Sequence, residues 1–164
     1  MLGLSLYPWL KFLHVASVLG FVAFHGVSML VAMRLFKERD RTRIAELLQF
    51  SGSAVRGMYV ALLLLIGFGV WTAFQLPGTW GAWWIWISIG LLVATAVEMG
   101  VVASPYYRDL KDAIQLRPSG VPRKSDEELD ELLRSRAPKF NAAFGVVALI
   151  AITWLMVYKP FGQI

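Results

Sequence analysis

Two histidines near the start of the chain, His14 and His25, are the side chains whose type and spacing point most directly to chemistry. Eleven positions separate them, so on one α-helix they would point about 20° apart and lie about 16–17 Å apart along the axis. An imidazole nitrogen can be an axial ligand of haem iron, but at this separation the two histidines could not bind the same iron. Each could hold a separate haem b, or His25 alone could hold one with a second ligand from elsewhere.

The alternative for either histidine is an imidazole that hydrogen-bonds between packed helices. Ser17, Phe21 and Ser28 fall on the same helical stripe. Such a polar stripe must face the interior of a bundle or a partner, because lipid offers it no hydrogen bonds. Thioether sulfurs are the soft second ligands that a haem site could use, and the candidates are Met29, Met33, Met58, Met99 and Met156.

Glu98 and Arg56 form the second group of candidate residues. Glu98 is the only acidic residue inside the segments that we expect to span a membrane, and it lies about 23 Å down its helix from Trp83. His25 lies about 20 Å down the first helix, at a similar depth. Two interpretations follow: Arg56 and Glu98 form a charge pair that fixes one helix against another, or Glu98 and His25 form a proton-accepting or ligand-binding pair.

The elements that must position these residues are membrane-spanning helices. Apolar residues make up 57% of the 164 residues, charged residues 16%, and the mean hydropathy is +0.59. Three runs carry no charge: 22 residues between Lys11 and Arg34, 41 between Arg56 and Glu98, and 19 between Lys139 and Lys159. A helix needs about 20 such residues to cross a bilayer. This composition excludes a soluble globular fold, a disordered chain and a secreted disulfide scaffold.

The longest run contains a turn signal, Leu76-Pro77-Gly78-Thr79, which divides it into two spans. We therefore predict an all-α protein, a single integral membrane domain over residues 1–164 that forms a four-helix transmembrane bundle. The predicted spans are residues 8–36, 55–75, 80–104 and 139–158. The charge-free core of the first span is too long for the apolar part of a signal peptide. Small residues at Ser53, Gly57 and Ala61 have the spacing that lets helices approach closely.

Basic residues predict the orientation. Six Lys and Arg residues lie from Arg34 to Arg56, none lies around Pro77, and eight lie from Arg108 to Lys139. The positive-inside rule then places the first and third loops in the cytoplasm and both termini outside, in the inner membrane of a bacterium. The net charge of +5 is explained by topology and lipid head groups, so nucleic acid is not an expected partner.

The cytoplasmic segment, residues 109–138, is expected to contain a short amphipathic helix over residues 126–137. Ser125 followed by Glu128 is a capping box, and Leu129, Leu132 and Leu133 fall on one side. This helix would lie on the membrane surface or pack under the bundle. The chain has no cysteine, which removes disulfides, thiolate metal sites, iron–sulfur clusters and covalently attached haem, and we predict no metal-ion site.

Three stretches carry a resemblance to known families: Trp9-Leu-Lys-Phe-Leu-His-Val15, Phe24-His-Gly-Val-Ser28 and Trp154-Leu-Met-Val-Tyr-Lys-Pro-Phe161. Together they resemble an uncharacterised family of small bacterial four-helix integral membrane proteins. The Leu-His-Val opening is also similar to the membrane domain of copper-resistance protein D and to the haem-associated membrane protoporphyrinogen oxidase. That second similarity implies copper or haem function for His14 and, more remotely, for His25.

Three functions remain open from the sequence. The first is a haem- or quinone-associated redox membrane protein that uses the helix-one histidines. The second is a small proton-coupled transporter around Glu98 and His25, which would need a homodimer because four helices are few for alternating access. The third is an accessory or scaffold subunit whose polar stripe packs on a partner in a larger membrane complex. No phosphate loop, metalloprotease helix or serine-nucleophile elbow is present, and whether the protein is an enzyme stays open.

Overall fold

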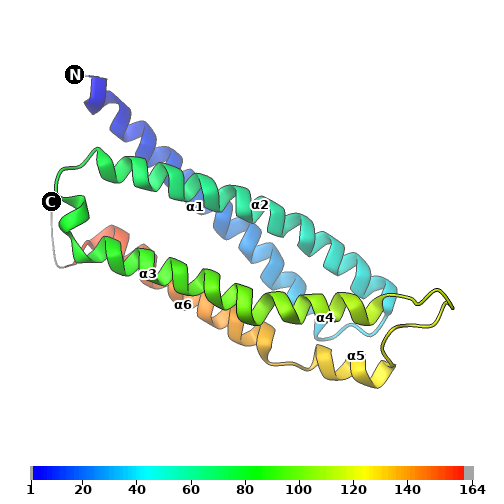
Figure 1. Cartoon of the computed structure of the whole chain (residues 1–164). Coiled ribbons are helices and arrows are strands. Elements are labelled where there is room, and N and C mark those ends of the chain that lie inside the picture. The colour runs from blue at the N-terminus through cyan, green and yellow to red at the C-terminus, as the bar shows by residue number, and fades with distance from the viewer. Residues whose placement is uncertain (1, 161–164) are drawn as a thin grey trace.

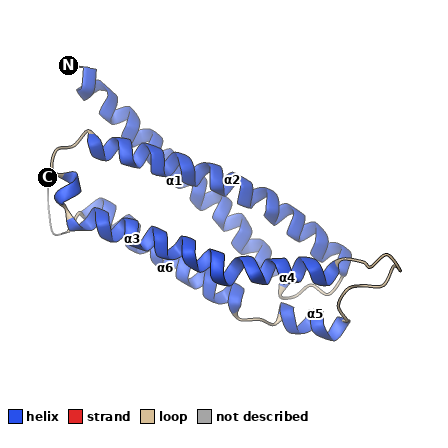
Figure 2. Cartoon of the chain, viewed as in Figure 1, coloured by secondary structure: helices blue, strands red, loops and turns tan. Residues whose placement is uncertain are grey.

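The computed structural model describes residues 2–160, which are helical almost throughout and contain no β-strand (Figure 2). The elements are α1 (Leu2–Leu35), α2 (Arg41–Phe74), the 3-10 turn η1 (Thr79–Gly81), α3 (Trp83–Glu98), the π-helical turn η2 (Met99–Ala103), α4 (Ser104–Ile114), α5 (Asp126–Leu133) and α6 (Ala137–Tyr158). Four segments are long and apolar enough to cross a membrane: Leu6–Leu35, Arg41–Phe74, Trp83–Ile114 and Asp126–Tyr158. The predicted all-α, four-helix class is confirmed.

Two antiparallel helix pairs build the bundle: α1 lies against α2, and α3 lies against α6 (Figure 1). Small residues bring α1 and α2 together. A Cβ added at Gly57 would lie 2.6 Å from ring carbons of Phe24, and one added at Gly20 would contact the Cβ of Ala61 at 3.7 Å. Two of the three residues in the predicted small-residue spacing, Gly57 and Ala61, therefore lie in this contact.

The two pairs are joined at their ends. At the end where α4 and α5 lie, a buried apolar core is formed by Val31, Leu35, Ile44, Leu48, Tyr106, Leu110, Ala113, Leu129 and Leu133. At the opposite end, a smaller core contains Ala73, Ala82, Trp84, Ile85 and Leu155. The N-terminal end of α1 and the C-terminal end of α6 both lie at this second end, as an even number of spans requires (Figure 1).

Arg41, the first residue of α2, connects α2 with α4 and with the start of α5. Its guanidinium donates hydrogen bonds to the carbonyl of Ala113 at 2.7 Å and to that of Lys124 at 3.0 Å, and it pairs with Asp126 at 2.7 Å. The last carbonyls of a helix have no partner within the helix, so Arg41 supplies one for α4. The same side chain holds the start of α5 against α2.

The second and third predicted spans are shorter than the helices that contain them. Helix α2 begins at Arg41 rather than at residue 55, which leaves only residues 36–40 between α1 and α2. The carboxylate of Asp40 starts this extra stretch by accepting hydrogen bonds from the backbone N–H groups of Thr42 and Arg43. The helix that contains the third predicted span continues past residue 104 through η2 and α4 to Ile114.

Helix α5 carries the predicted capping box but ends at Leu133, four residues before its predicted end. The Ser125 hydroxyl accepts a hydrogen bond from the Glu128 N–H at 3.2 Å, and the Glu128 carboxylate accepts one from the Ser125 N–H at 2.8 Å. Leu129 and Leu133 are buried in the core with α2 and α4. Of the two predicted positions for this helix, it takes the one packed under the bundle.

Candidate functional site

A cavity of about 640 Å³ lies between the two helix pairs, next to the core at the α4–α5 end. Residues of α1, α2, η2, α4 and α6 line it. Its lining on the third span extends from Met99 to Asp112, thirteen positions along the helix, which corresponds to about 20 Å of helix axis. The cavity is therefore elongated along the bundle.

The third span widens where it lines the cavity. Pro105 has no N–H to donate to the carbonyl of Val101, and its ring clashes with a carbonyl four residues back. The preceding turn, η2, is accordingly π-helical, and the Ser104 hydroxyl donates to the carbonyl of Met99 at 3.0 Å. Met99 and Ser104 both face the cavity. Turns of this kind recur at functional sites because they re-aim the side chains they carry.

His25 lies on the wall of the cavity. The Phe21 ring stacks on its imidazole with centroids 5.9 Å apart and planes 12° apart. A Cβ added at Gly145 of α6 would lie 3.1 Å from His25 Nε2, so the absence of a side chain at Gly145 leaves room for the imidazole. The Nδ1 atom is buried and has no hydrogen-bond partner among the described residues.

Ser28, about one turn further along α1, is like His25 a cavity-lining residue with an unpartnered polar atom. Its hydroxyl oxygen is buried without a partner in the described part of the chain, and the residue also lines the cavity. Buried polar groups in proteins are almost always hydrogen-bonded, to protein, water or a ligand. His25 and Ser28 therefore place two polar groups on one cavity wall whose buried Nδ1 and hydroxyl oxygen find no partner in the described residues.

Three of the five predicted thioether candidates, Met29, Met58 and Met99, line the same cavity as His25. Two do not: Met33 lies 56% exposed on the surface of α1, and Met156 packs at the other end of the bundle. The cavity thus combines one imidazole with soft sulfur atoms. Across residues 2–160, no three His, Asp or Glu side chains gather where they could hold a metal ion.

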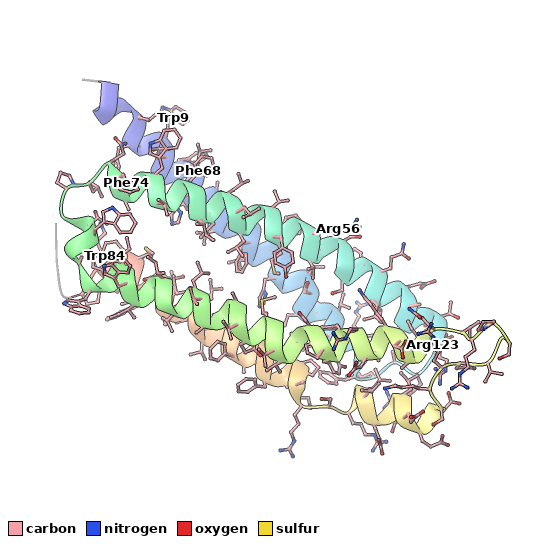
Figure 3. All side chains as sticks on the ribbon, viewed as in Figure 1. Trp9, Arg56, Phe68, Phe74, Trp84 and Arg123 are labelled. Carbon is pink, nitrogen blue, oxygen red and sulfur yellow. The ribbon has the colours of Figure 1, made fainter. Side chains whose placement is uncertain are left out.

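The other end of the cavity is basic. Arg108, Lys111 and Arg123 line it together with Asp112. Arg123 pairs with Asp112, whereas Arg108 and Lys111 have no carboxylate within 4.0 Å among the described residues. Figure 3 shows Arg123 at the end of the bundle opposite Trp84. The cavity therefore leads from an apolar region with an imidazole to a mouth with two unpaired cations.

His14 does not line the cavity, although it shares a stripe of α1 with His25. Its Nδ1 lies 2.9 Å from the carbonyl oxygen of Leu65 in α2. A carbonyl only accepts hydrogen bonds, so Nδ1 is the donor in this contact. A Cβ added at Gly69 would lie 3.0 Å from the same Nδ1, so this glycine admits the ring. The structure gives His14 a helix-packing partner and places it apart from His25.

The structure does not bring Glu98 and Arg56 together. Glu98 is 9% exposed on α3, and neither carboxyl oxygen has a partner among the described residues. Arg56 is exposed, on the side of α2 turned away from α3, and donates to the Ser53 hydroxyl at 3.3 Å (Figure 3). The predicted charge pair is absent because Arg56 points outward. Glu98 does not line the cavity, and it makes no hydrogen bond or ion pair with His25 within the part of the chain described here.

Our sequence reasoning missed the basic mouth of the cavity. From the sequence, Arg108 and Lys111 were considered only as basic residues that indicate the orientation of the chain in the membrane. The available signal was their spacing of three residues, which places both on one face of a helix that continues from a span. Tyr107 also lines the cavity.

Comparison with known proteins identifies the family. A family model described as predicted integral membrane protein (DUF2269) matches residues 8–160, which include both histidines and all of the cavity. The chain belongs to this family, in agreement with the resemblance to small membrane proteins. No curated protein and no solved structure matches the chain. The similarity to copper-resistance protein D and to the haem-associated oxidase is therefore not supported by these comparisons.

Proposed function

We propose that this integral membrane protein binds a redox cofactor of haem type in its cavity, with His25 as an axial ligand. The observation that carries the proposal is the His25 imidazole on the cavity wall, with a buried nitrogen that has no partner among the described residues. Of the two helix-one histidines, His25 lines this cavity and His14 does not. The proposal is therefore assigned to His25 and not to His14.

The residues around His25 fit haem b. The volume of about 640 Å³ lies in the range of about 300–1,000 Å³ that small-molecule sites occupy. Met29, Met58 or Met99 would supply a second axial ligand, and a His and Met pair is a known ligand set for haem iron. Bound haem b would supply one-electron redox chemistry. Gly145 makes room for the imidazole against α6, and the stacked Phe21 ring holds its plane.

The test is a titration of the purified protein with haem b, read as Soret absorption. We expect a saturable Soret band in the unmodified protein that is lost or shifted in His25→Ala. His14→Ala is the matched control, since it changes the same residue type on the same stripe of the same helix and is expected to keep the band. Absence of any Soret band after haem addition would overturn the proposal, as would a band that depends on His14 alone.

A proton-coupled transporter is the second candidate, favoured by Glu98. This carboxyl is buried in the third span with both oxygens unpartnered among the described residues, a setting that favours its neutral, proton-carrying form. Transport by four helices would require a second copy of the chain. The test is proton flux into proteoliposomes. Flux that is unchanged in Glu98→Gln would contradict this function.

We also propose that the α4–α5 end faces the bacterial cytoplasm and that both termini lie outside. The supporting observation is the gathering of basic residues at the α4–α5 end and their absence from the turn between α2 and α3. Because the chain lacks cysteine, single cysteines report topology cleanly. A membrane-impermeant maleimide should label Gly81→Cys in intact cells and Ser119→Cys only after permeabilisation. The reverse pattern would overturn this orientation.

A further inference from the structure

We propose that the ligand of this cavity carries an anionic group, a carboxylate in the case of haem, and that Arg108 and Lys111 bind it at the mouth. The inference rests on the proposed function and specifies the chemical class of its ligand. That ligand is an amphiphile with an apolar body about as long as the cavity and an anionic end.

The charge balance of the lining supports this assignment. Four charged residues line the cavity: Arg108, Lys111, Asp112 and Arg123. The pair between Arg123 and Asp112 is neutral, which leaves the charge of Arg108 and Lys111 unmatched by any carboxylate within 4.0 Å in residues 2–160. Arg41 at the same end is held by two carbonyls and a carboxylate, and Arg39 pairs with Asp130.

The position of the two cations supports it further. Both follow the π-helical turn on the third span, and their spacing of three residues sets them side by side on α4. Met99, which faces the apolar part of the cavity, lies about 18 Å from Lys111 along this span. A molecule that reaches His25 with its apolar body therefore has its other end near these cations. Arg108 in particular has the planar fork that binds a carboxylate through two hydrogen bonds.

Esterification of the ligand isolates the charge contribution. Haem b carries two carboxylates, and its dimethyl ester has the same ring without them. We expect the unmodified protein to bind haem more tightly than the ester. The Arg108→Gln/Lys111→Gln double variant should weaken haem binding about 3- to 30-fold, since solvent-exposed charge pairs contribute up to about 1 kcal/mol each. The same variant should leave binding of the ester unchanged.

A second double variant controls for the general loss of positive charge. Lys37→Gln/Arg43→Gln removes two exposed cations from the same end of the bundle that do not line the cavity. We expect it to leave both affinities unchanged. Measuring all proteins in neutral detergent and again in nanodiscs with phosphatidylglycerol distinguishes the sources of the anion. If lipid head groups also occupy the mouth, the anionic lipid weakens haem binding only where Arg108 and Lys111 are present.

Two results would overturn the inference while leaving the proposed function intact. One is haem affinity unchanged in the Arg108→Gln/Lys111→Gln variant, and the other is an equal loss for haem and its ester. If the unmodified protein binds neither form of haem, the proposed function fails. The same comparison with a fluorescent long-chain fatty acid and its methyl ester then decides the inference: preference for the acid that depends on Arg108 and Lys111 supports it, and equal binding or none overturns it.

Discussion

Replacing Gly69 by alanine tests the packing role that the structure gives to His14. The new Cβ would lie 2.9 Å from His14 Cε1 and 3.0 Å from Nδ1, the atom that is 2.9 Å from the Leu65 carbonyl oxygen. These separations are shorter than carbon and nitrogen atoms tolerate without a bond between them. The imidazole must therefore move away from α2, which both crowds the α1–α2 interface and weakens its hydrogen bond.

Three contributions set the size of the effect. Overpacking of a tight interface costs about 1–3 kcal/mol. A hydrogen bond between helices in a membrane contributes about 0.6 kcal/mol on average. Against these, alanine stabilises the helix by about 0.5–1 kcal/mol relative to glycine. We expect Gly69→Ala to lower the free energy of unfolding by about 1–3 kcal/mol.

The assay is unfolding in mixed micelles by SDS titration, followed by circular dichroism. Gly67→Ala is the matched control on the same helix, because an added Cβ there meets nothing within 4 Å, and it should raise the free energy of unfolding by up to about 1 kcal/mol. In a His14→Ala background the space is vacant, so Gly69→Ala should become neutral or stabilising. An equal cost of Gly69→Ala with and without the imidazole would refute this reasoning.

Four further substitutions test the polar groups outside this interface. Glu98→Met should raise the free energy of unfolding by about 1–3 kcal/mol in the same SDS titration, since it removes a buried carboxyl without a partner. Arg56→Gln should change the free energy of unfolding by less than about 0.5 kcal/mol. If Glu98→Met and Arg56→Gln both lowered it, the interpretation of these two residues as a charge pair would be supported instead. Arg41→Ala should lower the free energy of unfolding by about 1–3 kcal/mol because two backbone carbonyls lose their donor, and unaltered stability would contradict that connecting role. Ser125→Ala should destabilise α5 by about 1 kcal/mol, visible as faster amide hydrogen exchange confined to that helix, and exchange equal to the unmodified protein would argue against the cap.

The number of spans could be predicted because it depends on composition and on one turn signal, Pro77-Gly78. A helix in hydrocarbon needs about 20 apolar residues, and a charge-free run reports that directly. The start of α2 could not be found this way, since the stretch before residue 55 carries charges on its outer side. Its signals were local: a capping Asp40, then Ile44 and Leu48 at the spacing of one helical face. Hydropathy averaged over a window removes that pattern.

The candidate site was predictable only in part, for a different reason. Helical spacing places His14 and His25 on one stripe, but it does not state which neighbour each will meet. That depends on how α1 crosses the other helices, so His14 packs on Gly69 of α2 while His25 lies against Gly145 of α6. The separation between the two helix pairs, which creates the cavity, is likewise a tertiary property that no single helix encodes.

The contrast between the two histidines provides a thermodynamic test of where the site lies. His14 has a partner for its Nδ1, whereas the buried Nδ1 of His25 has none among the described residues. An unpartnered buried polar group costs about 1–3 kcal/mol. The stacked Phe21 ring packs on the imidazole but offers its nitrogens no hydrogen bond, so packing alone does not account for a histidine here. A ligand that binds His25 from the cavity stabilises the folded state only. Saturating haem should therefore raise the Tm of the unmodified protein and of His14→Ala, and raise that of His25→Ala much less. An equal rise in all three would show that haem binds away from His25.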